Sequence, residues 1–253
     1  MYTEEQFISL EEEERGLTDE VIAIIILTLS TVHIDLEKEL RNFYQKYGKD
    51  GVVTYAEARK WVSEKDHRRR LAALLSVSTL LFADALPKVK RELESMLKSV
   101  IGKETGLFDV EIDIDKILTM TWGEDDLNWL KRLEQDFDIW TVRINADLKT
   151  SMLQRKNLDD VLKLLDKRFD SIYYVVETLG LSESTAIGSM ARQKIFAELG
   201  ISKYQFYTKV DERRCETCGA MHGLIFPISA YEVGVTASPL HPRCRCWEVP
   251  IWD

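Results

Sequence analysis

The sequence predicts an α+β protein, with a mainly α-helical N-terminal region and a small C-terminal region of short antiparallel strands closed by a structural zinc site. Pro87 is the only proline in the first 226 residues, and apolar residues there recur with helical spacing. After about residue 200 the apolar residues alternate instead, and proline, glycine and cysteine become frequent. We place the boundary in the acidic stretch near residue 110, so the predicted regions are 1–110 and 111–253.

The first predicted helix runs from about Asp19 to Tyr47, because Thr18 can cap its first turn. Its apolar part, residues 21–34, is short for a membrane span and carries polar residues, which favours a buried helix. Thr54–Glu57 has the spacing of a capping box and predicts the start of the next helix. We therefore expect helices that pack against one another and no association with a membrane.

Pro87 fits the first turn of a helix. We therefore predict one helix over residues 71–85 and another that begins at Pro87 and ends near Gly102. A short strand is predicted at 110–114. The basic cluster His67–Arg70 precedes these elements, and a charge run of this kind most often forms a solvated surface.

Further helices are predicted over 124–153, from Asn157 to the residue before Gly180, and from Ser182 to the residue before Gly200, with Asn157 and Ser182 as caps. Three strands are predicted after them, at residues 204–210, 224–226 and 247–251. Tryptophans at helical spacing occupy core positions more often than they form a stacking platform, and we expect this of Trp122, Trp129 and Trp140.

The last forty residues contain all four cysteines, arranged as Cys215-x-x-Cys218 and His241-x-x-Cys244-x-Cys246. Two close pairs of soft ligands on separate turns can complete a tetrahedron around Zn²⁺, so this motif predicts a structural zinc site at 215–246. Five groups compete for four positions. We favour Cys215, Cys218, His241 and Cys244, with Cys246 as the substitute. Alternatively, Cys244 and Cys246 face the same side of a strand and displace His241.

A cysteine-rich site favours closed coordination, whereas a catalytic zinc keeps an open position and a nearby base. Glu216 and His222 are the nearby candidates for a base. We therefore expect no enzyme activity, with two alternatives left open. One is a zinc-stapled nuclease in which His222 or His241 activates water. The other is a zinc-bearing module that contacts nucleic acid through Arg213, Arg214, Arg243 and Arg245.

The net charge of −9 is unfavourable for a dedicated duplex-DNA binder, which usually presents a basic face. Only weak, non-specific DNA contact is expected, through the arginines around the cysteines. The N-terminus lacks the basic segment of a secretory signal. We therefore expect a reducing compartment, in which thiolates bind metal more readily than they form disulfides.

One block of sequence carries a specific resemblance. It reads Tyr207-Thr-Lys-Val-Asp-Glu-Arg-Arg-Cys-Glu-Thr-Cys218, then Gly223-Leu-Ile-Phe226, then Pro239-Leu-His-Pro-Arg-Cys-Arg-Cys246. This block resembles the phage head morphogenesis family, the minor capsid proteins related to phage Mu protein F and to the SPP1 minor head protein. The weaker resemblance of the preceding helix includes Arg192, at a position where the family often has an arginine.

The resemblance implies a minor structural component of a tailed-phage or prophage head, without a conserved catalytic centre. It implies a place in the virion, in the head interior near the portal, and in the host cytoplasm during assembly. The implied partners are the portal protein and, as further candidates, the scaffold or major capsid protein. The implied roles are head assembly and DNA packaging or ejection.

Overall fold

The computed structural model describes residues 4–48, 52 and 65–252, without the side chains of Glu4 and of residues 65–71. The predicted capping box at 54–57 and the side chains of the basic cluster 67–70 therefore lie outside the described residues.

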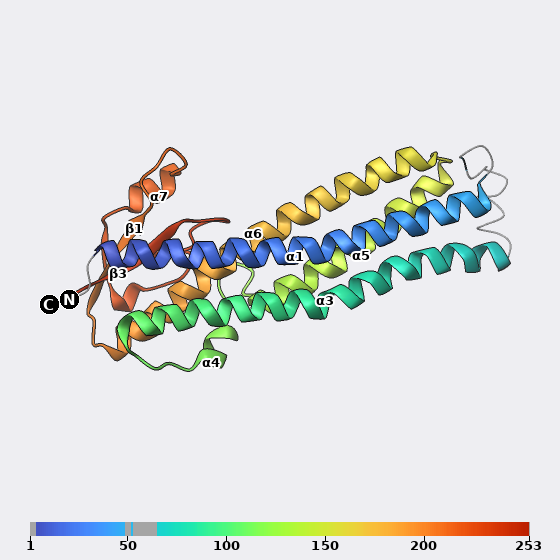
Figure 1. The fold of residues 1–253 in the computed structure, drawn as a ribbon. Coiled ribbons are helices and arrows are strands. Elements are labelled where there is room, and N and C mark those ends of the chain that lie inside the picture. The colour runs from blue at the N-terminus through green and yellow to red at the C-terminus, as the bar shows by residue number, and fades with distance from the viewer. Residues whose placement is uncertain (1–3, 49–51, 53–64, 253) are drawn as a thin grey trace. The chain divides into compact units, whose positions relative to one another are not determined.

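Long helices make up most of the described chain, and the strands follow the last of them (Figure 1). In chain order the elements are α1 (Glu4–Tyr47), α3 (Lys65–Phe108), α4 (Ile114–Leu118), α5 (Trp129–Leu153), α6 (Leu158–Glu198), β1 (Lys203–Thr208), α7 (Glu216–Met221), β2 (Ile225–Pro227), the 3-10 helix η1 (Ile228–Ala230) and β3 (Cys246–Ile251). The predicted α+β class is thus confirmed in its helical body and its small antiparallel sheet.

The chain forms two compact units, each built from separate stretches of sequence. Unit 1 contains Met1–Ala23, Arg91–Arg132 and Glu177–Asp253, and unit 2 contains Ile24–Lys90 and Leu133–Val176. The helices α1, α3, α5 and α6 contribute residues to both units. The predicted boundary near residue 110 divides the sequence into two continuous regions, whereas each of the two units combines separate stretches. The predicted boundary stays a prediction.

Two predicted helix boundaries near the N-terminus were wrong. Thr18 lies inside α1, where its hydroxyl donates to the carbonyl of Glu14 at 2.8 Å and lies 2.9 Å from the Ser184 hydroxyl. Pro87 lies inside α3 and does not begin a new helix. Phe82, Ala85 and Val89 are buried on both sides of this proline, so packing of the continuous apolar face outweighs the lost backbone hydrogen bond.

The helix α3 also continues past Gly102 to Phe108, and the predicted strand at 110–114 does not form. The short helix α4 begins instead at Ile114. Its cap is Asp113, whose carboxylate accepts a hydrogen bond from the Lys116 amide at 3.0 Å.

The cap at Asn157 is confirmed, because its side-chain oxygen accepts a hydrogen bond from the Asp160 amide at 2.8 Å. The predicted break at Gly180 was wrong, since α6 runs unbroken to Glu198. At Gly180, a β-carbon would lie 2.8 Å from the Ile22 side chain. This glycine therefore serves the close approach of α1 and α6 within unit 1 and does not end a helix.

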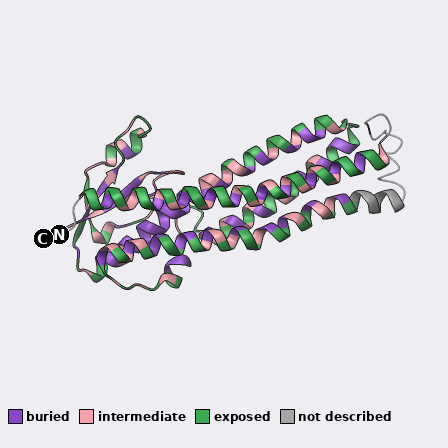
Figure 2. Ribbon diagram, viewed as in Figure 1, coloured by how far each residue is buried: buried purple, intermediate pink, exposed green. Residues whose placement is uncertain are grey.

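The secondary-structure elements assigned within the described part of unit 2 are all helices, and buried residues alternate with exposed ones along them (Figure 2). Leu29 and Leu36 of α1 and Phe169 of α6 are completely buried, whereas Leu27 and Ile34 are exposed. The apolar segment 21–34 is therefore only partly buried. Two helical stretches, Glu5–Tyr47 and Ala72–Phe108, are long and apolar enough to cross a membrane. Core helices of soluble proteins can have the same length and composition.

The sheet lies in unit 1 and has the antiparallel order β2-β1-β3. Tyr204 of β1 pairs with Phe226 of β2 and Pro250 of β3, which matches the three strands predicted from the sequence. Its aromatic side chains share a buried cluster with Phe7 of α1 and Phe196 of α6. This packing fixes the sheet at the end of α6 and so places the turns that carry the cysteines.

Candidate metal centre

The first cysteine pair lies on a turn that opens α7. Cys215 is the N-cap of this helix, and its sulfur accepts a hydrogen bond from the Cys218 amide at 3.3 Å. The short helix holds both sulfurs on one side of the turn, where Cys218 is buried and Cys215 is half-buried.

The second group lies on the loop that leads into β3. Cys246 begins that strand, and the Cys244 amide donates to the His241 carbonyl at 3.2 Å. Arg243 between them has a φ of 61°, in the left-handed region. This tight turn brings the His241 ring and the Cys244 sulfur to the same side of the loop.

The structure brings all five predicted ligands together. His241 Nε2 lies 3.2 Å from the sulfurs of both Cys215 and Cys218, and the Cys218 sulfur lies 3.7 Å from that of Cys244. Two overlapping groups can hold a metal ion, namely Cys215–Cys218–His241 and Cys218–Cys244–Cys246, with ligand atoms within 4.8 Å of one another. The geometry does not select four ligands from the five, so both arrangements considered from the sequence remain.

A hydrogen bond sets the orientation of the histidine. His241 Nδ1 lies 2.8 Å from the carbonyl oxygen of Pro242, which has only acceptor capacity. Nδ1 therefore donates this hydrogen bond, and Nε2 faces the sulfurs. This is the arrangement that outer partners impose on metal-binding histidines.

Charge within the cluster is unevenly distributed. Hydrogen bonds from the Cys218 and Cys246 thiols lower the pKa of Cys244 to about 3, so this sulfur carries the thiolate. The pKa values of Cys218 and Cys246 are raised, first because each thiol donates to Cys244 and then because of burial. Burial also acts on Cys215, but hydrogen bonds to its sulfur outweigh it and lower its pKa. A metal ion would replace these shared protons.

Two of the four arginines predicted to contact nucleic acid also make contacts that hold the loops. Arg245 makes a two-pronged ion pair with Asp211 at 2.5 and 2.6 Å, which joins β3 to the loop after β1. Arg243 donates to Thr178 and Glu177 of α6 at 2.8 and 2.9 Å. Arg213 and the adjacent Arg214 are exposed. DNA contact by the four arginines stays a prediction. Of the four, the exposed Arg213 and Arg214 are the most accessible to DNA.

The two candidate bases, His222 and Glu216, lie in different surroundings. The ring nitrogen Nδ1 of His222 accepts a hydrogen bond from the Thr208 amide at 3.2 Å, so β1 fixes this ring. Its edge also packs against the Tyr207 ring at 5.2 Å. Glu216 lies exposed in the first turn of α7.

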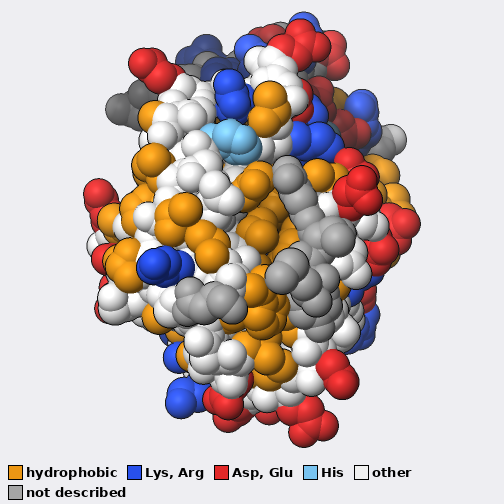
Figure 3. Space-filling model, turned by 90° about the vertical axis from the view of Figure 1, so that its left-hand side faces the viewer, with side chains coloured by type: hydrophobic (Ala, Val, Ile, Leu, Met, Phe, Trp, Pro, Cys, Tyr) orange, Lys and Arg blue, Asp and Glu red, His pale blue; other side chains and the backbone are white. Residues whose placement is uncertain are grey.

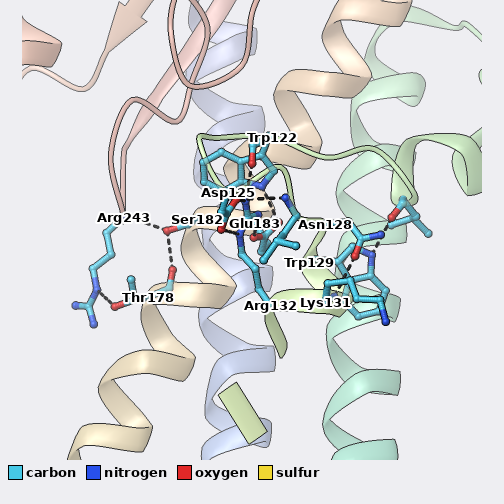
Figure 4. Close-up of polar contacts among 12 residues, drawn as sticks. Trp122, Asp125, Asn128, Trp129, Lys131, Arg132, Thr178, Ser182, Glu183 and Arg243 are labelled. Atoms are coloured by element: carbon cyan, nitrogen blue, oxygen red, sulfur yellow. Dashed lines mark hydrogen bonds and ion pairs between the residues drawn. The ribbon is translucent and has the colours of Figure 1, made fainter. Parts of the chain in front are cut away.

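An open cleft of about 500 Å³ adjoins the histidine loop, lined in part by Pro239, Leu240 and His241. On its other side Arg132 donates to Glu183 at 2.6 Å and to Asp125 at 2.5 Å (Figure 4). Trp122 joins the same group, since its indole N–H donates to Glu183 at 2.9 Å. The half-buried Trp122 thus has a polar role, whereas Trp129 and Trp140 are buried core residues as predicted.

A buried charged network behind the sheet was not foreseen. Arg192, where the sequence resemblance placed an arginine, donates to Glu104 at 2.6 Å and to Glu248 at 3.0 Å. Glu248 also accepts from the Tyr231 hydroxyl at 3.0 Å and lies two residues after Cys246. The cysteine strand is therefore anchored through ion pairs to α3 and α6. The residues come from distant parts of the sequence, so spacing alone gives no signal for them.

Comparison with known proteins identifies the family. A family model described as phage Mu protein F like protein matches residues 122–249, just over half of the chain. No curated protein and no solved structure matches. The matched region includes both cysteine groups, β1, β2 and the first four residues of β3. The chain therefore belongs to the phage Mu protein F like family, whose members act in phage head morphogenesis.

Proposed function

We propose that this chain is a structural minor head protein of a tailed phage or prophage. In this proposal it associates with the portal inside the head and acts in head assembly and in DNA packaging or ejection. The observation that carries the proposal is the family match, because it spans the sheet, the cysteine cluster and the arginine that anchors them. Its place is the virion and, during assembly, the host cytoplasm.

We further propose that the Cys/His cluster holds a structural Zn²⁺ ion. Thiolates and a neutral imidazole are ligands that zinc prefers, and cysteine-rich sites are usually closed. Three of the cysteines are buried, and the loops around them are fixed by the Asp211–Arg245 and Glu177–Arg243 ion pairs. The ion would join the α7 turn to β3, which is a role in folding and not in catalysis.

A head protein needs surfaces for other proteins, and unit 1 offers apolar surface. β2 is an edge strand, and Leu224 and Ile225 beside it are 46% and 56% exposed. An edge strand with apolar side chains is a natural template for contact with another chain. Figure 3 shows hydrophobic side chains gathered over the middle of the face that it presents.

The decisive experiment is co-expression with the portal protein from the same gene cluster, followed by affinity purification through a tag on the portal. We expect the chain to co-purify with the portal and to be present in purified particles. A matched pair of variants tests the surface: Ile225→Lys on β2 should weaken capture, whereas Val142→Lys on α5, where the side chain is also more than half exposed, should not.

Particles that lack the chain, or fully infectious particles made without it, would overturn the head-protein proposal. If the scaffold or major capsid protein captured the chain and the portal did not, the partner would be that protein, and the role in the head would stand. DNA cleavage lost in His222→Ala, with the fold unchanged, would instead support the zinc-stapled nuclease.

A further inference from the structure

A second group of metal-ligating side chains lies in unit 2, far along the sequence from the cysteines. It consists of His33 and Glu37 of α1 and Asp166 of α6, and one ligand atom of each lies within 4.8 Å of the others. Residues four apart share one face of a helix, so α1 presents His33 and Glu37 side by side. His33 Nε2 is 3.2 Å from a carboxylate oxygen of Asp166.

Stacking on Phe169 holds the His33 imidazole in place, but its Nε2 atom has no hydrogen-bond partner among the described residues. The His33 ring stacks on Phe169 with centroids 4.2 Å apart and planes 9° apart, and Phe169 is completely buried. His33 Nε2 is itself buried and lacks a hydrogen-bond partner among the described residues. The Asp166 carboxylate oxygen therefore lies within ion-pair distance of His33 Nε2 but is not aligned for a hydrogen bond. A buried polar atom without a partner costs free energy, which a ligand would recover.

We propose that His33, Glu37 and Asp166 bind a divalent first-row transition-metal ion. An imidazole nitrogen suits zinc, cobalt and nickel, and two carboxylates balance the charge of the ion. Ligand bonds of about 2.0–2.2 Å would require only a small closing of the present group. Glu37 is paired with Arg41 at 3.7 Å, a long contact that the ion would replace.

The site differs in chemistry from the cysteine cluster. Its ligands are one nitrogen and two oxygens, without sulfur, and three protein ligands leave positions for water or another group. The Asp166 side chain is 53% exposed and that of Glu37 is 29% exposed, so an ion can enter from solvent. Bound there, the ion would fasten α1 to α6 within unit 2. The proposal is independent of the role in the phage head.

The probe is Co²⁺, added to the full-length protein after its cysteine cluster has been saturated with Zn²⁺. We expect about one further ion to bind, with visible absorption that lacks the strong sulfur-to-cobalt charge-transfer band. Glu37→Gln and Asp166→Asn preserve side-chain shape and should each weaken binding at least about tenfold, the minimum seen even for outer-shell partners. Co²⁺ should also raise the melting temperature of the wild type.

Asp35→Asn is the matched control, because it removes one negative charge from the same helix two residues from His33, on a different face. It should bind Co²⁺ like the wild type. No uptake after zinc saturation would overturn the proposal. So would uptake that survives Asp166→Asn and Glu37→Gln, because the ion would then lie elsewhere. His33→Ala tests the nitrogen ligand, and circular dichroism would show whether loss of the Phe169 stack unfolds it.

Discussion

Arg192 is a single buried cation among several buried or half-buried carboxyl groups of unit 1. It pairs with Glu104 and Glu248, and Glu14 is also buried. Among the described residues, one oxygen of Glu14 and one of Glu104 lack hydrogen-bond partners. Burial raises the pKa of Glu104 from its usual value of 4.5 to about 7, although Arg192 opposes the shift. The pKa of Glu14 is raised as well, first by burial and then by Glu104. The network therefore retains protons near neutral pH.

This retention predicts a pH-dependent stability of unit 1. The unfolded chain releases the Glu104 proton near pH 4.5, whereas the folded chain keeps it to about pH 7. The stabilising contribution is therefore present below the lower value and lost as pH rises through the upper one, on the order of 3 kcal/mol in total. Urea unfolding from about pH 5 to about pH 8 measures this slope.

Glu104→Gln should flatten the slope, because glutamine cannot titrate and its amide oxygen can still accept a hydrogen bond from Arg192. Glu111→Gln, at an exposed position of the same unit, should leave the slope unchanged. The two variants differ in burial and share the same chemical change. Equal slopes in wild type and Glu104→Gln would show that the proton is held elsewhere.

At the scale of elements, α7 and β3 depend on one another through the cysteine cluster. The double change Cys215→Ser and Cys218→Ser should reduce the zinc held by this cluster from about one ion per chain to none, since half of the cysteine ligands are removed. Hydrogen exchange should then become faster in α7 and β3, while the part of α5 in unit 2 keeps its protection. The check is elemental analysis together with exchange followed by mass spectrometry.

Thr217→Ala is the control for that experiment, because Thr217 is exposed on the same turn between the two cysteines. It should keep both the metal and the protection. Metal-free wild-type protein with an unchanged fold would refute the structural role of zinc.

The elements differ in how far local sequence determines them. The three C-terminal strands, the Asn157 cap and the helix end before Gly200 follow from signals within a few residues, and each was predicted correctly, whereas the strand predicted at 110–114 was wrong. Pro87 and Gly180 carry local signals for a break, yet both lie inside continuous helices. Tertiary packing decides there, through buried neighbours around Pro87 and the approach of Ile22 to Gly180. No local pattern encodes that packing.

The same distinction applies to the candidate site. The spacing of the four cysteines and His241 alone predicted that these five residues form one cluster, because each of the two groups is close in sequence. The structure brings them together. The partners that support them were not predictable in this way. Arg243 reaches Glu177 of α6 and Arg192 reaches Glu248 of β3, and such pairs depend on how the chain folds back on itself.

For the whole molecule, the net charge of −9 opposes contact with DNA. We therefore predict weak binding to random-sequence duplex that declines with salt, mediated by the exposed Arg213 and Arg214. Their replacement by alanine should reduce the slope of log affinity against log salt by about 2, because each arginine that neutralises a phosphate adds about 1 to this slope. A salt titration of wild type against the double variant measures the difference.

Lys163→Ala with Lys167→Ala removes the same charge from exposed positions of α6 and should leave the slope nearly unchanged. If both double variants bind equally, or if binding is tight and insensitive to salt, the arginines serve the fold or a protein partner.

Unit 1 consists of three separate stretches of sequence, and this affects the order in which it can fold during synthesis on the ribosome. Its stretches Met1–Ala23 and Arg91–Arg132 are translated before Glu177–Asp253, and this last stretch carries every cysteine and every strand. Both stretches of unit 2 are complete by Val176. The nascent chain can therefore bury the apolar faces of unit 2 while the early helices of unit 1 still await their sheet. The Cys/His cluster can form only after the turn that carries Cys244 and Cys246 has left the exit tunnel, so it assembles after both stretches of unit 2 have been translated.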